Sequence, residues 1–163
     1  MVRLLVVFAL VVAGLAQSRV SVAKEPAPDT VIALQRGACE NRCAVSRLVV
    51  FVDGTVIYEG RYFVRHPGLI KGSISPEALN KLIEDVEASG FFQLESDYGY
   101  ENNNGCKSID PDTDGPMAIL SVSNQGRSKT VLHHHRCVGP VPNKITELEN
   151  RIDHAVGVVR WIK

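Results

Sequence analysis

Three consecutive histidines, His133 to His135, are the residues whose type and spacing point most directly to chemistry. Alternate side chains of a strand share a face, so His133 and His135 are expected about 6 to 7 Å apart, a spacing at which two imidazoles can bind one Zn²⁺ or Cu²⁺. A third ligand, such as His66 or an acidic residue of segment 95–116, is still required. The pair is therefore a candidate transition-metal site. The alternative is a polar strand end in which one histidine is hydrogen-bonded in the core.

Three alternate aspartates, Asp110, Asp112 and Asp114, copy the first half of an EF-hand loop. The second half of the EF-hand pattern is missing, because the position that should carry a bidentate glutamate is Ser121. Calcium binding by the three aspartates is therefore a second candidate. Its alternative is a turn in which an aspartate side chain accepts a hydrogen bond from the nearby backbone.

The N-terminal segment, residues 1–23, has the order of a secretory signal peptide. Arg3 precedes 13 residues without charge, Leu4 to Ala16, and small residues offer cleavage points after Ala16 or after Ala23. Thirteen residues form about 20 Å of helix, short of the roughly 30 Å needed to cross a bilayer. We therefore expect a signal peptide, an extended leader at residues 24–30, and a periplasmic or secreted mature chain without a membrane span.

Four cysteines are most simply interpreted as two disulfides in an exported chain of this size. They allow three connectivities, of which we favour Cys39 with Cys43 and Cys106 with Cys137. A thioredoxin-type redox motif is disfavoured because three residues, not two, separate the first pair. Zinc bound by four thiolates remains a weaker alternative, because the spacing does not match paired zinc knuckles.

The overall composition is that of an ordinary globular domain. The 163 residues include 18 basic and 18 acidic side chains, 45% hydrophobic residues and 22% charged residues. Removal of residues 1–23 takes away two arginines and no acid, which leaves the mature chain slightly acidic. This balance argues against a strongly basic nucleic-acid binder and against a highly charged disordered tail.

The hydrophobic pattern predicts an α+β domain over residues 31–163. Two hairpins are expected, the first around Asp53-Gly54, where both central turn positions favour positive φ, and the second around residues 124–127. Ser75 is positioned to cap a helix that ends at Gly90, and a second helix begins near Pro142. The predicted order is β β β α β β α, an antiparallel sheet of about five strands packed by two amphipathic helices.

Several short motifs resemble a family of small exported bacterial domains that is known only as a domain of unknown function. The likeness covers about residues 31–161 and is carried by Gly37-Ala38-Cys39, Cys43, Asp53-Gly54, Tyr58-Glu59-Gly60, Phe91 to Leu94, Tyr98, Cys106, Thr113 to Pro116 and His133 to Cys137. The chain departs from the family pattern at Asn41 and Ala44, where glycine and proline are usual. The resemblance implies the same fold and disulfides but no activity.

No nucleophile motif or phosphate-binding loop accompanies these features. We therefore expect a non-catalytic, disulfide-stabilised module that binds a protein or a small molecule through its sheet face or segment 95–116. The alternative is a metal-binding protein or metal-dependent enzyme that uses His133 and His135. No cofactor is expected apart from the transition-metal and calcium candidates, and no nucleic-acid partner.

Overall fold

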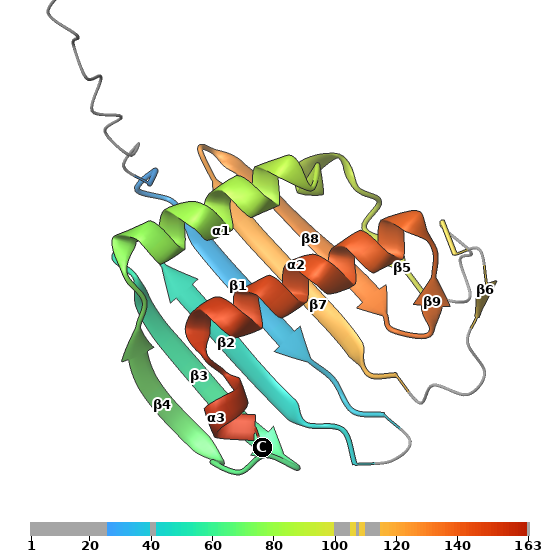
Figure 1. Ribbon diagram of the computed structural model, residues 1–163, viewed down its shortest axis with the longest axis horizontal. Coiled ribbons are helices and arrows are strands. Elements are labelled where there is room, and N and C mark those ends of the chain that lie inside the picture. The colour runs from blue at the N-terminus through green and yellow to red at the C-terminus, as the bar shows by residue number, and fades with distance from the viewer. Residues whose placement is uncertain (1–25, 40–41, 100–104, 107, 110–114, 163) are drawn as a thin grey trace, which may run out of the picture.

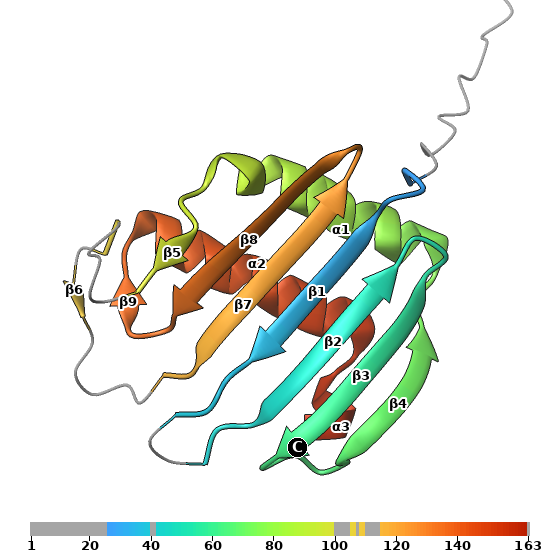
Figure 2. The ribbon, with the colours of Figure 1, turned by 180° about the vertical axis from the view of Figure 1, so that it is seen from behind.

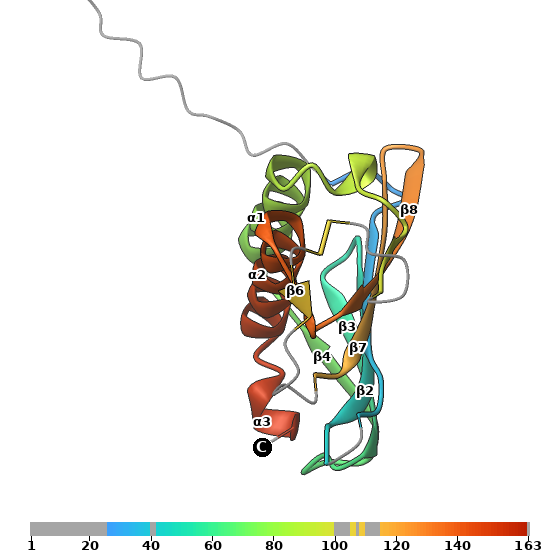
Figure 3. The ribbon, with the colours of Figure 1, turned by 90° about the vertical axis from the view of Figure 1, so that its right-hand side faces the viewer.

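The computed structural model describes residues 26–39, 42–99, 105–106, 108–109 and 115–162. The predicted signal peptide and the three aspartates of the calcium candidate lie outside these residues. The described chain forms two layers, a twisted sheet and a pair of helices on one of its faces (Figures 1 and 3). In chain order the elements are β1 (Val31–Arg36), β2 (Val45–Phe51), β3 (Thr55–Tyr62), β4 (Gly68–Ser73), α1 (Pro76–Ala88), the 3₁₀ helix η1 (Phe91–Gln93), β5 (Asp97–Tyr98), β6 (Ser108–Ile109), β7 (Met117–Asn124), β8 (Arg127–His134), β9 (Cys137–Val138), α2 (Pro140–Val156) and α3 (Val159–Ile162).

Seven strands form the main sheet in the order β4-β3-β2-β1-β7-β8-β5. Its neighbours pair antiparallel except β5, which runs parallel to β8. The α+β class is therefore confirmed, but the prediction of a purely antiparallel sheet of about five strands is wrong, because the sheet is mixed and has seven. Strands β6 and β9 form a separate two-stranded sheet.

The two strands of the main sheet that were not predicted, β4 and β5, have little sequence pattern that would indicate a strand. Strand β4 has the sequence GLIKGS, whose two glycines weaken any strand pattern, and β5 has only two residues. Both lie at the edges of the sheet, where pairing satisfies backbone groups of β3 and β8. Tertiary pairing, not local preference, therefore accounts for them.

The two tight hairpin turns differ from each other in backbone geometry. At the first, Gly54 has φ of 77°, but Asp53 does not have positive φ and instead accepts a hydrogen bond from the Thr55 amide at 2.8 Å. The expectation of positive φ at both central positions is therefore wrong there. The β7–β8 turn has that geometry, with φ of 54° at Gln125 and 71° at Gly126.

Helix α1 begins and ends where capping chemistry favours it. The Ser75 hydroxyl accepts the amide hydrogen of Ala78 at 3.2 Å at the start of α1, and Gly90 adopts the left-handed conformation just after its end. The inner faces of α1 and α2 bury Leu82 and Ile152 against the sheet. No helix of the described residues is long and apolar enough to cross a membrane.

Two disulfides join the cysteines in the favoured connectivity. Cys39 is bonded to Cys43, with a Cα separation of 5.6 Å, and Cys106 is bonded to Cys137, with a Cα separation of 5.1 Å. Because Cys137 begins β9, two residues after His135, the second disulfide fixes Cys106 close to the histidines. No cysteine is free.

Candidate functional site

The end of β8 places two of the three histidines between the sheet and the helices. His133 faces inward near the end of β8 and His134 faces outward, and His135, in the turn that follows the strand, again faces inward toward Glu149. The His133 side chain is 1% exposed and that of His135 is 20% exposed. Their ring centroids are 4.8 Å apart, so the structure brings together the pair that the sequence singled out.

The residue that joins the two histidines is Glu149 of α2, whose side chain is fully buried. Its Oε1 lies 3.0 Å from Nδ1 of His133, and its Oε2 lies 2.7 Å from Nε2 of His135. Both contacts are hydrogen bonds in which the imidazole N–H donates when it carries the proton. One carboxylate therefore holds both rings.

Arg36, the last residue of β1, connects this carboxylate to a second one. Its Nη1 donates to Oε2 of Glu149 at 3.2 Å, while Nε and Nη2 donate to Oδ2 of Asp153 at 3.2 and 2.6 Å. Glu149 and Asp153 are four residues apart, so they lie on the same side of α2. We call Arg36, His133, His135, Glu149 and Asp153 the His–Glu cluster.

The two carboxylates of the cluster have opposite pKa shifts. Burial acts to raise the pKa of Glu149, but hydrogen bonds from His133 and His135 outweigh it and lower the pKa from its usual 4.5 to about 2. Burial raises the pKa of Asp153, and repulsion by Glu149 adds to the shift, although Arg36 acts in the opposite direction. Glu149 is therefore the fixed negative charge of the cluster.

One buried nitrogen of the cluster has no hydrogen-bond partner among the residues that the structure describes. Nε2 of His133 is buried without one, whereas Nδ1 of the same ring contacts Glu149. A neutral ring with its proton on Nδ1 donates to the carboxylate and leaves only a lone pair unsatisfied.

Gly115 and Pro116, just before β7, pack directly on His135. The amide of His135 donates to the carbonyl of Pro116 at 3.2 Å. A Cβ added at Gly115 would lie 2.8 Å from the Cβ of His135, closer than such atoms approach in proteins. Glycine at position 115 is therefore what lets this segment lie against the cluster.

The sequence could have revealed Glu149, although it did not reveal Arg36 or Asp153. Ile145, Glu149 and Ile152 share the apolar face of α2, so Glu149 is a charged residue at a core position of the helix. By contrast, His66, which we had considered as a third metal ligand, is exposed in the β3–β4 turn, outside the cluster.

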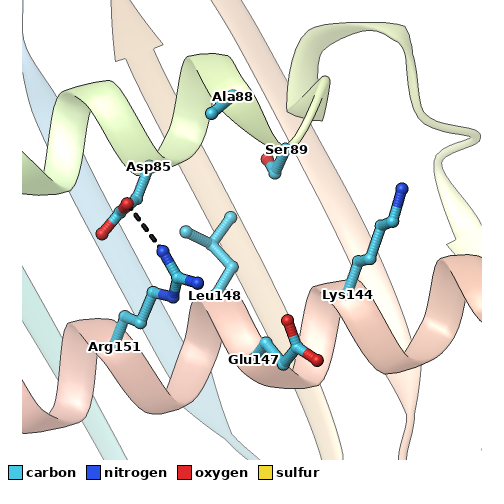
Figure 4. A pocket seen from close by; sticks show the side chains of 7 residues that line it. All are labelled: Asp85, Ala88, Ser89, Lys144, Glu147, Leu148 and Arg151. Atoms are coloured by element: carbon cyan, nitrogen blue, oxygen red, sulfur yellow. Dashed lines mark hydrogen bonds and ion pairs between the residues drawn. The ribbon is translucent and has the colours of Figure 1, made fainter.

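Apart from the His–Glu cluster, the structure has a hollow between α1 and α2 (Figure 4). Arg151 Nη1 donates to Oδ1 of Asp85 across it at 2.7 Å, and Lys81 Nζ donates to the same oxygen at 2.8 Å. Asp85 is thus satisfied by two cations of the helices themselves. We interpret these ion pairs as a contact between the two helices and not as a ligand-binding site.

The opposite face of the sheet carries no helix in the part of the chain that the structure describes (Figure 2). An antiparallel sheet usually presents polar side chains to water on such a face. Here, by strand alternation and register, the outward side chains include Val31, Ala33, Val49, Phe51, Ile57, Leu69, Met117, Ile119 and Leu132. We call these side chains the open sheet face.

The comparisons with known proteins place the chain in a family. The sequence model of the family described as "Domain of unknown function (DUF6438)" matches residues 30–156. The chain belongs to this family. The match spans every strand of the main sheet and all of α2, so this DUF6438 domain includes the His–Glu cluster and the open sheet face. No curated protein matches the chain.

Proposed function

We propose that the mature protein is an exported, non-catalytic interaction module that binds a partner protein on the open sheet face. The observation that carries this proposal is the concentration of apolar side chains on a face without a helical layer. Leu69 is 76% exposed, Phe51 39% and Met117 38%. Apolar surface of this kind, when it gathers on one face, is typical of protein interaction sites.

Export is supported by the N-terminal sequence and by the cysteines. Residues 1–23 have the pattern of a signal peptide, and all four cysteines are paired in disulfides. Disulfides persist in oxidising compartments and are rare in the reducing cytosol. Both features are expected of a module that works outside the cytoplasm.

Charge on the open sheet face specifies the chemistry of the partner. Arg47 lies beside a shallow hollow that Val49, Ile57 and Leu69 also line. Among the described residues the Arg47 side chain has no ion-pair or hydrogen-bond partner, whereas the neighbouring Glu59 is already paired with Arg61 at 3.0 Å. The complementary surface is therefore an apolar patch of a protein with a carboxylate opposite Arg47.

Site-specific photo-crosslinking in the native host tests this proposal. A photoreactive amino acid at Ile57 should give a discrete adduct with one protein, and the same group at Glu84, on the outer side of α1, should not. Equal adducts from both positions, or none from Ile57, would contradict the proposal. A concentration-dependent dimer in sedimentation velocity would make the partner a second copy and also overturn it.

The purified partner then provides a quantitative test. We expect Arg47→Glu to weaken its binding at least about tenfold, because a charge reversal replaces attraction with repulsion. Lys144→Glu, the same reversal at an exposed residue of α2, is the matched control and should leave the affinity unchanged. Equal effects of the two variants would mean that the open sheet face is not the binding surface.

A further inference from the structure

We propose that His133, His135 and Glu149 bind one Zn²⁺ ion, with Arg36 and Asp153 orienting the carboxylate from outside the ligand set. This site is independent of the proposed partner surface, because it lies on the other face of the sheet. It gives the two histidines of the sequence the third ligand that their spacing requires.

The distances already approach those of a zinc site. One ligand atom from each of the three residues can be chosen so that all lie within 4.8 Å of one another. Tetrahedral Zn²⁺ with bonds of about 2.0 to 2.1 Å separates neighbouring ligand atoms by about 3.3 Å. The imidazole-to-carboxylate distances of 3.0 and 2.7 Å lie close to that value, so small side-chain rotations suffice.

The donor set selects the kind of ion. Two imidazole nitrogens and one carboxylate oxygen suit Zn²⁺, whereas calcium and magnesium prefer oxygen ligands alone. Three protein ligands leave a fourth position for water. His135, 20% exposed, is the member of the trio through which an ion and water can enter.

Zinc binding depends on which ring nitrogen of each histidine carries the proton. An ion needs the lone pairs of Nδ1 of His133 and Nε2 of His135, so each neutral ring must carry its proton on the other nitrogen. Nε2 of His133 has no hydrogen-bond partner among the described residues, so the tautomer change breaks no bond there but leaves an N–H without an acceptor, a cost that the metal bonds must exceed. What each imidazole loses is its bond to Glu149, which the shared ion replaces.

The surrounding charges also favour a cation. With both carboxylates ionised, Arg36, Glu149 and Asp153 together carry one negative charge, which a divalent ion meets in a buried setting. Arg36 donates two N–H groups to Asp153 and one to Glu149. Such outer hydrogen bonds hold a ligating carboxylate in position.

Calorimetric titration with ZnCl₂ tests the site on the mature, untagged protein after dialysis against a chelator. We expect one equivalent to bind, and affinity to fall at least about 100-fold in the variant His135→Ala plus Glu149→Gln, since two of three ligands are lost. The matched control, His66→Ala plus His154→Ala, removes two exposed histidines and should bind like the wild type. Absence of stoichiometric binding by the wild type, or loss of binding in the control, would overturn the proposal.

A measurement on the wild type keeps the test valid if the double variant does not fold. Nitrogen NMR of the imidazole rings should show zinc-induced shifts at Nδ1 of His133 and Nε2 of His135, with His66 and His154 unmoved. Shifts confined to the exposed histidines would contradict the site. Failure here would leave crosslinking from Ile57 unaffected, so the two proposals are separable.

Discussion

A fully buried carboxylate dominates the chemistry of this molecule at the scale of single residues. Burying an unpaired carboxylate costs several kcal/mol, and Glu149 avoids this by contacting two imidazoles and one guanidinium. The histidines were predictable as a pair because a strand places alternate residues on one face. Arg36 and Asp153 were not, because their contacts join residues more than 100 positions apart in the sequence.

Arg36→Gln should be strongly destabilising because it removes the cation from both carboxylates. The Arg36 side chain is 13% exposed, so its loss leaves charge uncompensated in the interior, at a cost of about 3 kcal/mol. Arg61→Gln removes a pair in which the arginine is 53% exposed, and it should cost no more than about 1 kcal/mol. Urea unfolding measures both values, and equal costs would mean that the cluster does not depend on its guanidinium.

Strands and helices with a strong local signal are the elements that the sequence predicted well. Both hairpins have regular alternation, and Ser75 and Gly90 mark the limits of α1, so short-range chemistry was sufficient. The edge strands β4 and β5 depend on partners elsewhere in the fold, which periodicity does not reveal. The same limit applies to the ion pair between Asp85 of α1 and Arg151 of α2, residues that are far apart in the sequence.

Asp85→Asn should weaken the contact between the helices in a pH-dependent manner. Burial acts to raise the pKa of Asp85, but the Lys81 hydrogen bond and the Arg151 charge outweigh it, so the pKa lies below its usual 3.8. A lowered folded-state pKa stabilises the protein fully above the unfolded-state value, and this contribution disappears as the pH falls through the folded-state value. We expect the variant to lose about 1 kcal/mol near neutral pH, and this loss to shrink progressively as the pH falls below the ordinary pKa of an aspartate.

Urea unfolding of wild type and variant at several pH values measures this difference. Glu84→Gln, which changes a side chain of α1 that is 72% exposed, is the control and should give a small difference throughout. A loss for Asp85→Asn that stayed constant down to low pH would show that the charge of Asp85 is not what pairs the helices.

At the scale of the whole molecule, the two layers separate two kinds of surface. The helices cover one face of the sheet, and no helix of the described residues covers the other (Figures 2 and 3). The His–Glu cluster is buried on the helical side, whereas apolar side chains are exposed on the open sheet face. The two disulfides constrain different parts of this arrangement. One closes a short ring just before β2, and the other joins Cys106 to the start of β9, beside the histidine strand.

The Cys106–Cys137 disulfide should stabilise the fold more than Cys39–Cys43 does. In the chain-entropy account, a crosslink restricts the unfolded chain more when it closes a longer loop. Sequence separations of 31 and 4 then correspond to about 4 and about 2 kcal/mol. Alanine pairs at 106 and 137, and at 39 and 43, should lower the urea midpoint in that order under oxidising conditions. The reverse order would mean that the short ring contributes through native-state contacts, since chain entropy cannot favour the shorter loop.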